Sequence, residues 1–224
     1  MNILLIDEVA IVRASIRRVL DASDLVTQVH EAANSLHGLT ILRSHDIDIV
    51  IMDLGSDSLS ILDVARRMLA SSPELKIIAL TSQLEGPFPA RLLQAGVSAC
   101  MSKRSRVADL FSAIKAVNVG KRYVSTDVAK RLETELTFDK QQSRFLSLSN
   151  RELQIMYMFV KGMRVQPIAD KLFLSPKTVN TYRYRIFDKL GVRGDVEMTH
   201  MALRCGVLNQ RRWEGDFLPQ QQAS

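Results

Sequence analysis

The sequence predicts an α/β protein whose first part is a doubly wound, five-stranded parallel sheet and whose second part is all helix. Up to residue 118, short apolar runs alternate with stretches in which apolar residues recur at helical spacing. This alternation is typical of a parallel sheet covered by helices on both faces. Beyond residue 120 the strand pattern stops and only helical patterns follow. The 224 residues are enough for two cores of ordinary size.

Five apolar runs are the predicted strands. The run Ile49–Met52 is continuous and mostly β-branched, as expected of a strand buried on both faces. Between the runs lie amphipathic stretches, for example at Val12, Ile16 and Val19, which predict the covering helices. The five predicted strands are Ile3–Ile6, Val26–His30, Ile49–Asp53, Lys76–Leu80 and Val97–Met101.

The second half of the chain carries the signals of helix ends. Ser125–Asp127 begins a helix, and the polar stretch Thr137–Arg144 is typical of a linker. Ser149–Glu152 forms a capping box, and Ser175–Pro176 is a second helix start. Glycines that can end helices stand at Gly162 and Gly206. We therefore expect a sheet domain at 1–120, a helical linker at 121–146, a helical domain at 147–208 and a mobile tail at 209–224.

Positive charge is concentrated in the second half. Residues 1–120 hold 12 basic and 13 acidic side chains, whereas residues 121–224 hold 18 and 11. A nearly neutral first half and a basic second half suggest that the second half binds a polyanion.

Nothing in the sequence predicts a membrane or secreted protein. No apolar stretch approaches the roughly 18 to 20 residues of a membrane span, and the start MNILLIDE lacks the basic residues of a signal peptide. We therefore expect a cytoplasmic protein without membrane insertion. Cys100 and Cys205 lack the spacing of metal ligands, so we expect reduced, partly buried thiols.

Acidic residues follow two of the predicted strands. Asp7 and Glu8 follow the first strand, and Asp53 ends the third. In a sheet of order 2-1-3-4-5, these two strands are neighbours at the point where such sheets bind ligands. Three carboxylates at one spot are hard oxygen ligands and predict a Mg²⁺ site. Beside that ion, Asp53 is a plausible nucleophile toward a phosphoryl group.

Two more strand ends supply the donors that phosphoryl transfer needs. Thr81 follows the fourth strand and Lys103 follows the fifth, and a hydroxyl and an ammonium at these places stabilise phosphoryl charge. Each of these residues alone is more often a cap, a core residue or a solvated side chain. Their arrival together at successive strand ends is what indicates a site.

The segment LSPKTVNTYRYRIFDKLGV indicates a second site. Val179, Tyr182, Ile186 and Leu190 form an apolar stripe, and a shorter helix at Pro167–Leu172 precedes it, which gives helix-turn-helix proportions. A recognition helix reads bases in the major groove with its N-terminal half, while basic residues hold phosphates. A solvated basic face is the simpler alternative. The predicted base contacts are Asn180, Thr181 and Tyr184; the other predicted DNA-binding residues are Lys177, Thr178, Arg183 and Arg185.

The acidic cluster resembles the active site of bacterial response-regulator receiver domains. The likeness is carried by Asp7-Glu8, Asp53, Thr81, Lys103 and the segment Gly120-Lys-Arg-Tyr-Val. It implies a flavodoxin-like fold with Asp53 as phosphoacceptor and with Thr81 and Lys103 stabilising the phosphoryl group. The implied Mg²⁺ ligands are Asp7, Glu8, Asp53 and Gly55.

The chain departs from this family at several positions. Asp57 and Ile61 stand where receivers usually have proline and glycine, and Glu8 where aspartate is commoner. Cys100 replaces the aromatic residue that in the family follows the threonine inward on phosphorylation. These differences leave open whether phosphate switches the protein.

The second domain also resembles a known family. Leu148–Val207 is similar to the LuxR-type helix-turn-helix of the NarL/FixJ class, and SPKTVNTYRYRIFDKL resembles the GacA/UvrY/SirA group. The resemblance implies a two-component regulator that a membrane-bound hybrid sensor histidine kinase phosphorylates and that binds double-stranded promoter DNA as a homodimer. In this class the last helix supports dimerisation, and the expected face comprises Val196, Met201, Ala202 and Leu203.

Three functions are consistent with these features. The first is a transcription factor gated by phosphorylation of Asp53. The alternative is a phosphorylation-independent transcription factor whose atypical receiver serves as a constitutive dimerisation or ligand-sensing module. A phosphatase is disfavoured, because Gly55 stands where a second catalytic acid is expected. We therefore expect no enzyme that acts on an external substrate.

Overall fold

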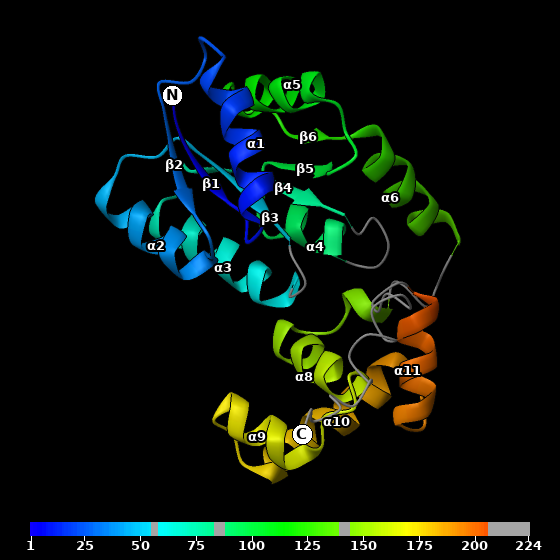
Figure 1. Ribbon diagram of the computed structural model, residues 1–224. Helices are drawn as coiled ribbons and strands as arrows, with labels where there is room; N and C mark the ends of the chain where they lie inside the picture. The colour runs from blue at the N-terminus through cyan, green and yellow to red at the C-terminus, as the bar shows by residue number, and fades with distance from the viewer. Residues whose placement is uncertain (55–57, 83–87, 139–143, 206–224) are drawn as a thin grey trace, which may run out of the picture. The chain divides into compact units, whose positions relative to one another are not determined.

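The computed structural model describes residues 1–54, 58–82, 88–138 and 144–205. The chain forms two compact units, the first comprising Met1–Leu84 and Phe88–Thr137 and the second beginning at Phe138 (Figure 1). Within the described residues, no helix is both long enough and apolar enough to cross a membrane.

The first unit is built on one parallel sheet of order β2-β1-β3-β4-β5-β6. The predicted α/β fold and the order of the first five strands are thus confirmed, but the sheet has six strands where the sequence predicted five. The sixth is two residues long, too short to show a periodic pattern. The strands are β1 (Asn2–Ile6), β2 (Gln28–Ala32), β3 (Ile49–Asp53), β4 (Lys76–Thr81), β5 (Ala99–Ser102) and β6 (Tyr123–Val124).

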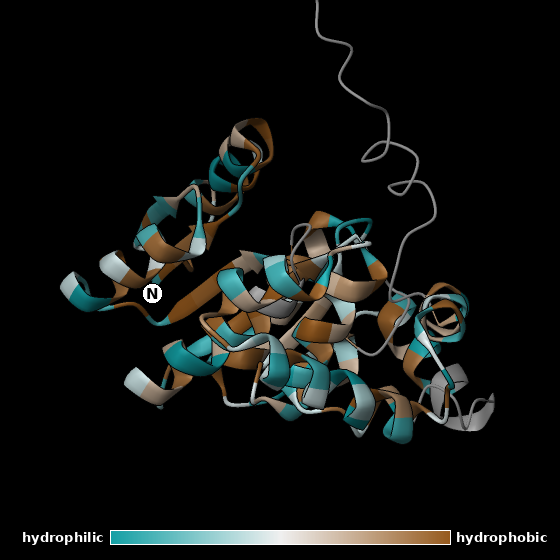
Figure 2. Ribbon diagram, turned by 90° about the horizontal axis from the view of Figure 1, so that it is seen from below, coloured by the Kyte–Doolittle hydropathy of each residue, from teal (hydrophilic) through white to brown (hydrophobic). Residues whose placement is uncertain are grey.

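Helices cover both faces of this sheet (Figure 1). Ile3 and Ile49 face one core with α1 (Ala10–Asp21) and α5 (Val107–Asn118). Residues of alternate register, such as Leu4 and Val50, face the other core. This two-sided burial explains the continuous apolar strands, which are brown in Figure 2. The helices of the second face are α2 (Ser35–Ser44), α3 (Ser58–Ser71) and α4 (Phe88–Gln94).

The chain leaves the sheet through its short edge strand. β6 pairs with β5, and α6 (Thr126–Phe138) follows directly, as the helix start at Ser125–Asp127 predicted. Ser125 is buried between the two elements: its backbone N–H donates to the Cys100 carbonyl at 3.1 Å, and its hydroxyl accepts from the Ser102 N–H at 3.1 Å. The start of α6 is therefore tied to β5 on either side of residue 101.

The second unit is helical, as predicted. The capping box is present: Ser149 accepts from the Glu152 N–H, and the Glu152 carboxylate accepts from the Ser149 N–H. Ser175 caps the third helix with Pro176 in its first turn. Gly206 lies outside the described residues. The helices are α8 (Asn150–Val160), α9 (Val165–Leu172), α10 (Pro176–Leu190) and α11 (Asp195–Arg204).

The core of the second unit contains part of the face through which the last helix was expected to dimerise. Val179, Ile186 and Leu190 of α10 are fully buried, as their spacing predicted. Met201 and Ala202, expected on a dimer face, are buried in this core, whereas Val196 is 73% exposed. The reason is that α11 packs against α8 and has to supply one wall of a small core.

Candidate functional site

Three charged side chains meet at the carboxyl end of the sheet. Asp7 directly follows β1 and Asp53 ends the adjacent strand β3. Lys103 follows β5, and its Nζ lies 2.7 Å from Asp53 Oδ2 and 3.0 Å from Asp7 Oδ2. Asp7 is only 2% exposed, so the ammonium neutralises two carboxylates that have little access to water.

The surroundings of Lys103 favour its charged form. Burial alone would lower the pKa of this lysine, but its hydrogen bonds to Asp53 and Asp7 outweigh burial and raise the pKa above its usual value. The strand ends are also joined by their backbones, because the Lys103 N–H donates to the Thr81 carbonyl at 2.7 Å. Thr81 is itself buried at the end of β4, whose Leu80 pairs with Asp53.

The other predicted metal ligands are placed less closely. Glu8 is exposed, and it lies in the bend that follows β1. It still lines, with Asp7 and Asp53, a cavity of about 420 Å³ beside Asn34 and other residues of the β2–α2 connection. Gly55 lies outside the described residues, as does Asp57.

Two carboxylates are enough for the expected cation. Among the described residues, no three acidic, histidine or cysteine side chains lie close enough to hold a metal by themselves. Mg²⁺, however, is commonly held by one or two carboxylates together with waters and phosphate oxygens. Asp7 and Asp53 fit this requirement, and Glu8 lines the same cavity.

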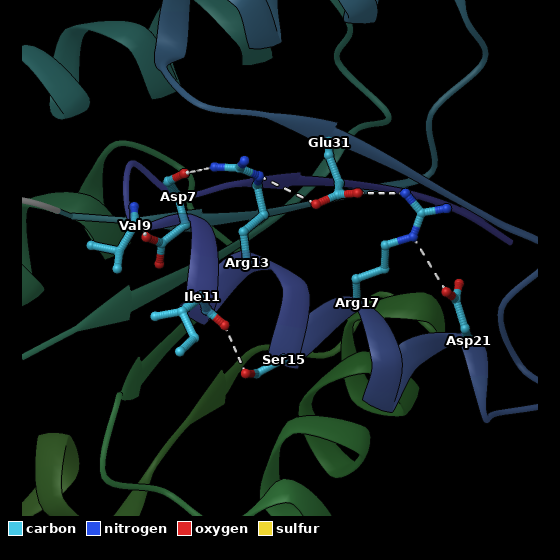
Figure 3. Close-up of polar contacts among 8 residues, drawn as sticks. All are labelled: Asp7, Val9, Ile11, Arg13, Ser15, Arg17, Asp21 and Glu31. Carbon is cyan, nitrogen blue, oxygen red and sulfur yellow. Dashed lines mark hydrogen bonds and ion pairs between the residues drawn. The ribbon is translucent and has the colours of Figure 1, made fainter.

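An arginine network holds the backbone at Asp7 (Figure 3). Arg13 of α1 donates to the Asp7 carbonyl at 2.8 Å and to Glu31 of β2 at 3.2 Å. Arg17, one turn further along α1, pairs with Glu31 and with Asp21. The Asp7 carboxylate itself accepts from the Val9 N–H at 2.8 Å. The role of Arg13 was not predicted from the sequence. The available signal was the spacing of Arg13 and Arg17, one helical turn apart, which is consistent with a shared partner.

Cys100 lies fully buried in β5, at the position of the missing aromatic residue. Burial raises the pKa of its thiol to about 12. The thiolate is the reactive form, so a thiol of this kind is inert at ordinary pH. Ile61, another departure from the receiver pattern, is buried in the core between the sheet and α3.

This burial predicts the reactivity of Cys100. In a Cys205→Ser variant, which leaves Cys100 as the single thiol, we expect no labelling by a disulfide reagent at pH 8 within minutes, and one equivalent after unfolding in urea. Absorbance of the released chromophore measures both. Rapid labelling of the folded variant would contradict the buried placement.

The predicted DNA-binding residues lie on α10 or at its start, and the structure leaves most of them accessible. Lys177, Thr181, Tyr184 and Arg185 are exposed, and the remaining three, Thr178, Asn180 and Arg183, are partly buried. Thr178 contributes to the cap of the helix, because its N–H donates to the Ser175 hydroxyl at 3.1 Å.

Arg183 differs from the other members of this set. Its Nε donates to Asp195 Oδ1 at 2.9 Å, and its second terminal nitrogen pairs with Asp195 Oδ2. The guanidinium also lies over the rings of Phe159 and Phe187, 5.1 and 5.6 Å from their centroids. A side chain held in this way joins α10 to the first turn of α11, and its predicted phosphate contact stays a prediction.

Both units match known protein families. Residues 3–115 match the response regulator receiver domain, and residues 146–202 match the bacterial regulatory proteins of the luxR family. Over 210 residues the chain is 41% identical to the response regulator UvrY of Escherichia coli strain K12, covering 93% of this chain and 96% of that protein. It is also 41% identical over 211 residues to the response regulator GacA of Pseudomonas syringae pv. syringae, with 93% and 98% covered.

Solved structures of similar architecture include complexes with DNA. RcsB from Salmonella enterica serovar Typhimurium, bound to promoter P1flhDC in the presence of the phosphomimetic BeF₃⁻, gives a TM-score of 0.60 at 27% identity. That comparison covers 93% of this chain and 99% of the other. A second structure, of an RcsB–DNA complex, gives 0.59 at 26% identity and covers 91% and 98%.

Proposed function

The chain belongs to the DNA-binding response regulators of two-component systems that join a receiver domain to a LuxR-family helix-turn-helix, and we propose that phosphorylation of Asp53 controls its dimerisation and promoter binding. The observation that carries this proposal is the meeting of Asp53, Asp7 and Lys103 at the carboxyl end of the sheet. We assign residues 1–120 to the receiver, 121–146 to the linker, 147–208 to the DNA-binding domain and 209–224 to a tail.

The proposed transfer begins from a phosphorylated histidine of a sensor kinase. A carboxylate oxygen of Asp53 attacks the phosphorus and forms an O–P bond, while the P–N bond breaks and its electron pair leaves with the imidazole, which binds a proton. Lys103 is 2.7 Å from Asp53 and can follow the phosphoryl oxygens as their charge develops. Mg²⁺, when bound by Asp7 and Asp53, supplies further positive charge to those oxygens.

The proposed output is promoter binding by a homodimer. Asn180 and Thr181 lie on the N-terminal half of α10 and Tyr184 just past its middle, and all three are proposed to read base edges in the major groove. Lys177 and Arg185 are exposed and are proposed to hold phosphates, with Thr178 at the helix start. The similar RcsB structure is bound to a promoter, which supports double-stranded promoter DNA as the partner of this chain.

The proposed cellular setting is the cytoplasm. The protein acts there without membrane insertion and receives its phosphoryl group from a sensor histidine kinase. It has no external substrate: the chemistry at Asp53 modifies the protein itself.

A second candidate rests on Cys100. This residue is a small, buried thiol where receivers usually carry the aromatic residue that responds to phosphate. In this alternative the protein binds DNA independently of phosphorylation, and the receiver serves as a constitutive dimerisation or ligand-sensing module.

One experiment tests the proposal and separates it from this candidate. The full-length protein is incubated with Mg²⁺ and acetyl phosphate, and intact mass is expected to rise by about 80 Da, the mass of one HPO₃ group, in the parent but not in Asp53→Asn. DNA affinity is then measured by fluorescence anisotropy, using a 30-base-pair duplex selected from random sequence by the parent protein.

Phosphorylation is expected to tighten binding of the parent by about 5- to 150-fold, as a coupling free energy of roughly 1–3 kcal/mol would. It is expected to leave Asp53→Asn unchanged. Equal affinity with and without a demonstrated phosphoryl adduct would overturn the gating and favour the constitutive receiver.

A further inference from the structure

An exposed aromatic side chain lies in the turn before α10. Phe173 is 96% exposed, the highest value among the exposed large apolar residues of the described chain. Its backbone is left-handed, with φ 54° and ψ 45°, and it is the one non-glycine residue with positive φ among those described. Glycine or asparagine adopts this conformation easily, whereas a bulky aromatic residue does so at a cost in free energy.

The turn does not need the aromatic ring. The Phe173 N–H donates to the Asp170 carbonyl, and the Leu174 N–H donates to the Ala169 carbonyl at 2.9 Å. Arg151 of α8 fixes the turn from outside by donating to the Leu172 carbonyl at 2.9 Å. All of these contacts are made to backbone atoms, so asparagine or glycine at position 173 would preserve them. The fold of the unit therefore gives no reason for a phenyl ring at this place.

The ring adjoins the surface that is proposed to bind DNA. Phe173 stands two residues before Ser175, the cap of α10, and the residues from Ser175 to Lys177 are exposed. The surrounding charge suits a polyanion, because the segment 161–185 has one acid, Asp170, and five basic residues besides Arg183, which pairs with Asp195. These five are Lys161, Arg164, Lys171, Lys177 and Arg185. Continuity with α10 and this charge favour DNA over a protein as the group that covers the ring.

We propose that Phe173 makes an apolar contact with promoter DNA at the edge of the site read by α10. The carbon-rich groups that DNA offers to a phenyl ring are the thymine C5-methyl group and the deoxyribose, and aromatic contact with the thymine methyl is an established mode of base readout. The contact adds affinity without charge. It rests on the proposed function, since it requires that α10 binds DNA.

The test compares the full-length parent with Phe173→Asn, in which the new residue tolerates the left-handed backbone. The probe is the selected 30-base-pair duplex, with a scrambled duplex as the non-specific control. We expect affinity for the selected duplex to fall about 5- to 10-fold, with an unchanged slope of log affinity against log salt. Lys177→Ala serves as the contrasting variant and should make that slope shallower by about one. The midpoint of thermal unfolding should stay equal to that of the parent or rise.

The two sources of apolar contact are separated by replacing each thymine of the duplex with uracil, which removes the methyl group alone. If uracil at one position lowers the DNA affinity of the parent but not that of Phe173→Asn, the ring contacts the methyl group of that thymine. If no position has this effect, the ring contacts a deoxyribose. Equal affinity of Phe173→Asn and parent would overturn the proposal. In that case, reduced transcription at saturating DNA would assign the ring to a protein partner instead. Failure of the proposed function itself is distinguishable, because the parent would then not prefer the selected duplex over the scrambled one.

Discussion

Replacing Lys103 by methionine is expected to destabilise the receiver by about 3 kcal/mol at neutral pH in the absence of Mg²⁺, the usual cost of removing one partner from a buried ion pair. The ammonium lies within 3.0 Å of Asp7 and Asp53, of which Asp7 is buried and Asp53 mostly so. Methionine fills a similar volume without charge, so the two carboxylates are left facing each other. Hydrogen exchange of the β1 and β3 amides measures this effect separately from the second unit.

Mg²⁺ should restore much of the stability lost in Lys103→Met. A cation held by Asp7 and Asp53 binds the folded state alone, so its contribution grows with concentration. Adding Asp53→Asn to Lys103→Met should also recover stability, because one of the two opposed charges is removed. Lys121→Met, a change at an exposed lysine, is the matched control and should leave exchange unaltered. A Lys103→Met receiver as stable as the parent without metal would show that the lysine does not hold the carboxylates.

The pH dependence follows from the raised pKa of Lys103. The stabilisation by its charge is complete below about pH 10.5, the ordinary value for lysine, and is lost as pH rises through the higher pKa of the folded state. Between neutral pH and that alkaline range, the difference in stability between parent and Lys103→Met should therefore stay constant.

Replacing Glu152 by alanine is the second change with a large expected effect, about 2 to 4 kcal/mol on the DNA-binding unit. The nearly buried carboxylate accepts from the Ser149 N–H at 2.6 Å and from Lys189 Nζ at 2.7 Å. One side chain therefore caps α8 and joins it to the end of α10. Alanine leaves a helix-start N–H and a lysine without this partner.

The measurement for Glu152→Ala is a urea titration followed by amide NMR of the full chain. Resonances of α8 and α10 should disappear at lower urea than in the parent, while those of the receiver act as an internal control. Glu152→Gln, which keeps the shape, should lose about half as much, and Asp188→Ala, at an exposed acid, should stay within about 0.5 kcal/mol of the parent. If α8 and α10 unfolded at the same urea concentration in Glu152→Ala and in the parent, Glu152 would not stabilise this unit.

Low pH should reduce the stabilisation that Glu152 gives to the DNA-binding unit of the parent protein. Burial alone would raise the pKa of Glu152, but the hydrogen bonds from Lys189 and Ser149 outweigh it and hold the pKa below its usual value of 4.5. The stabilisation is therefore present above about pH 4.5 and is lost as pH falls through the lower pKa of the folded state.

The fold was predictable wherever burial imposes a long pattern. Ile49–Asp53 was placed correctly because a strand covered on both faces has to be apolar throughout. The second strand was placed two residues early, since Val26 is apolar but precedes the pairing with β1, which begins at Gln28. β6 was missed because two residues that extend an existing edge carry no period of their own.

Site residues could be predicted from the sequence where the end of a strand determines the position of the side chain. Asp7, Asp53 and Lys103 meet because parallel strands bring their carboxyl ends to one edge. Glu8 could not be placed in this way, since the direction of a side chain two residues beyond a strand depends on the local turn. The pairing of Arg183 with Asp195 was also out of reach, because it depends on how α11 packs and on no spacing within α10.

Ser125 lies between the proposed phosphorylation site and the linker helix. Asp53 is paired with Lys103, the residue before Lys103 is Ser102, and the Ser102 N–H donates to the Ser125 hydroxyl directly ahead of α6. The carboxylate of Asp53 is thus connected to the start of the linker helix through the Lys103 side chain, the backbone of residues 102 and 103 and one hydrogen bond. None of these contacts involves the side chain at position 100.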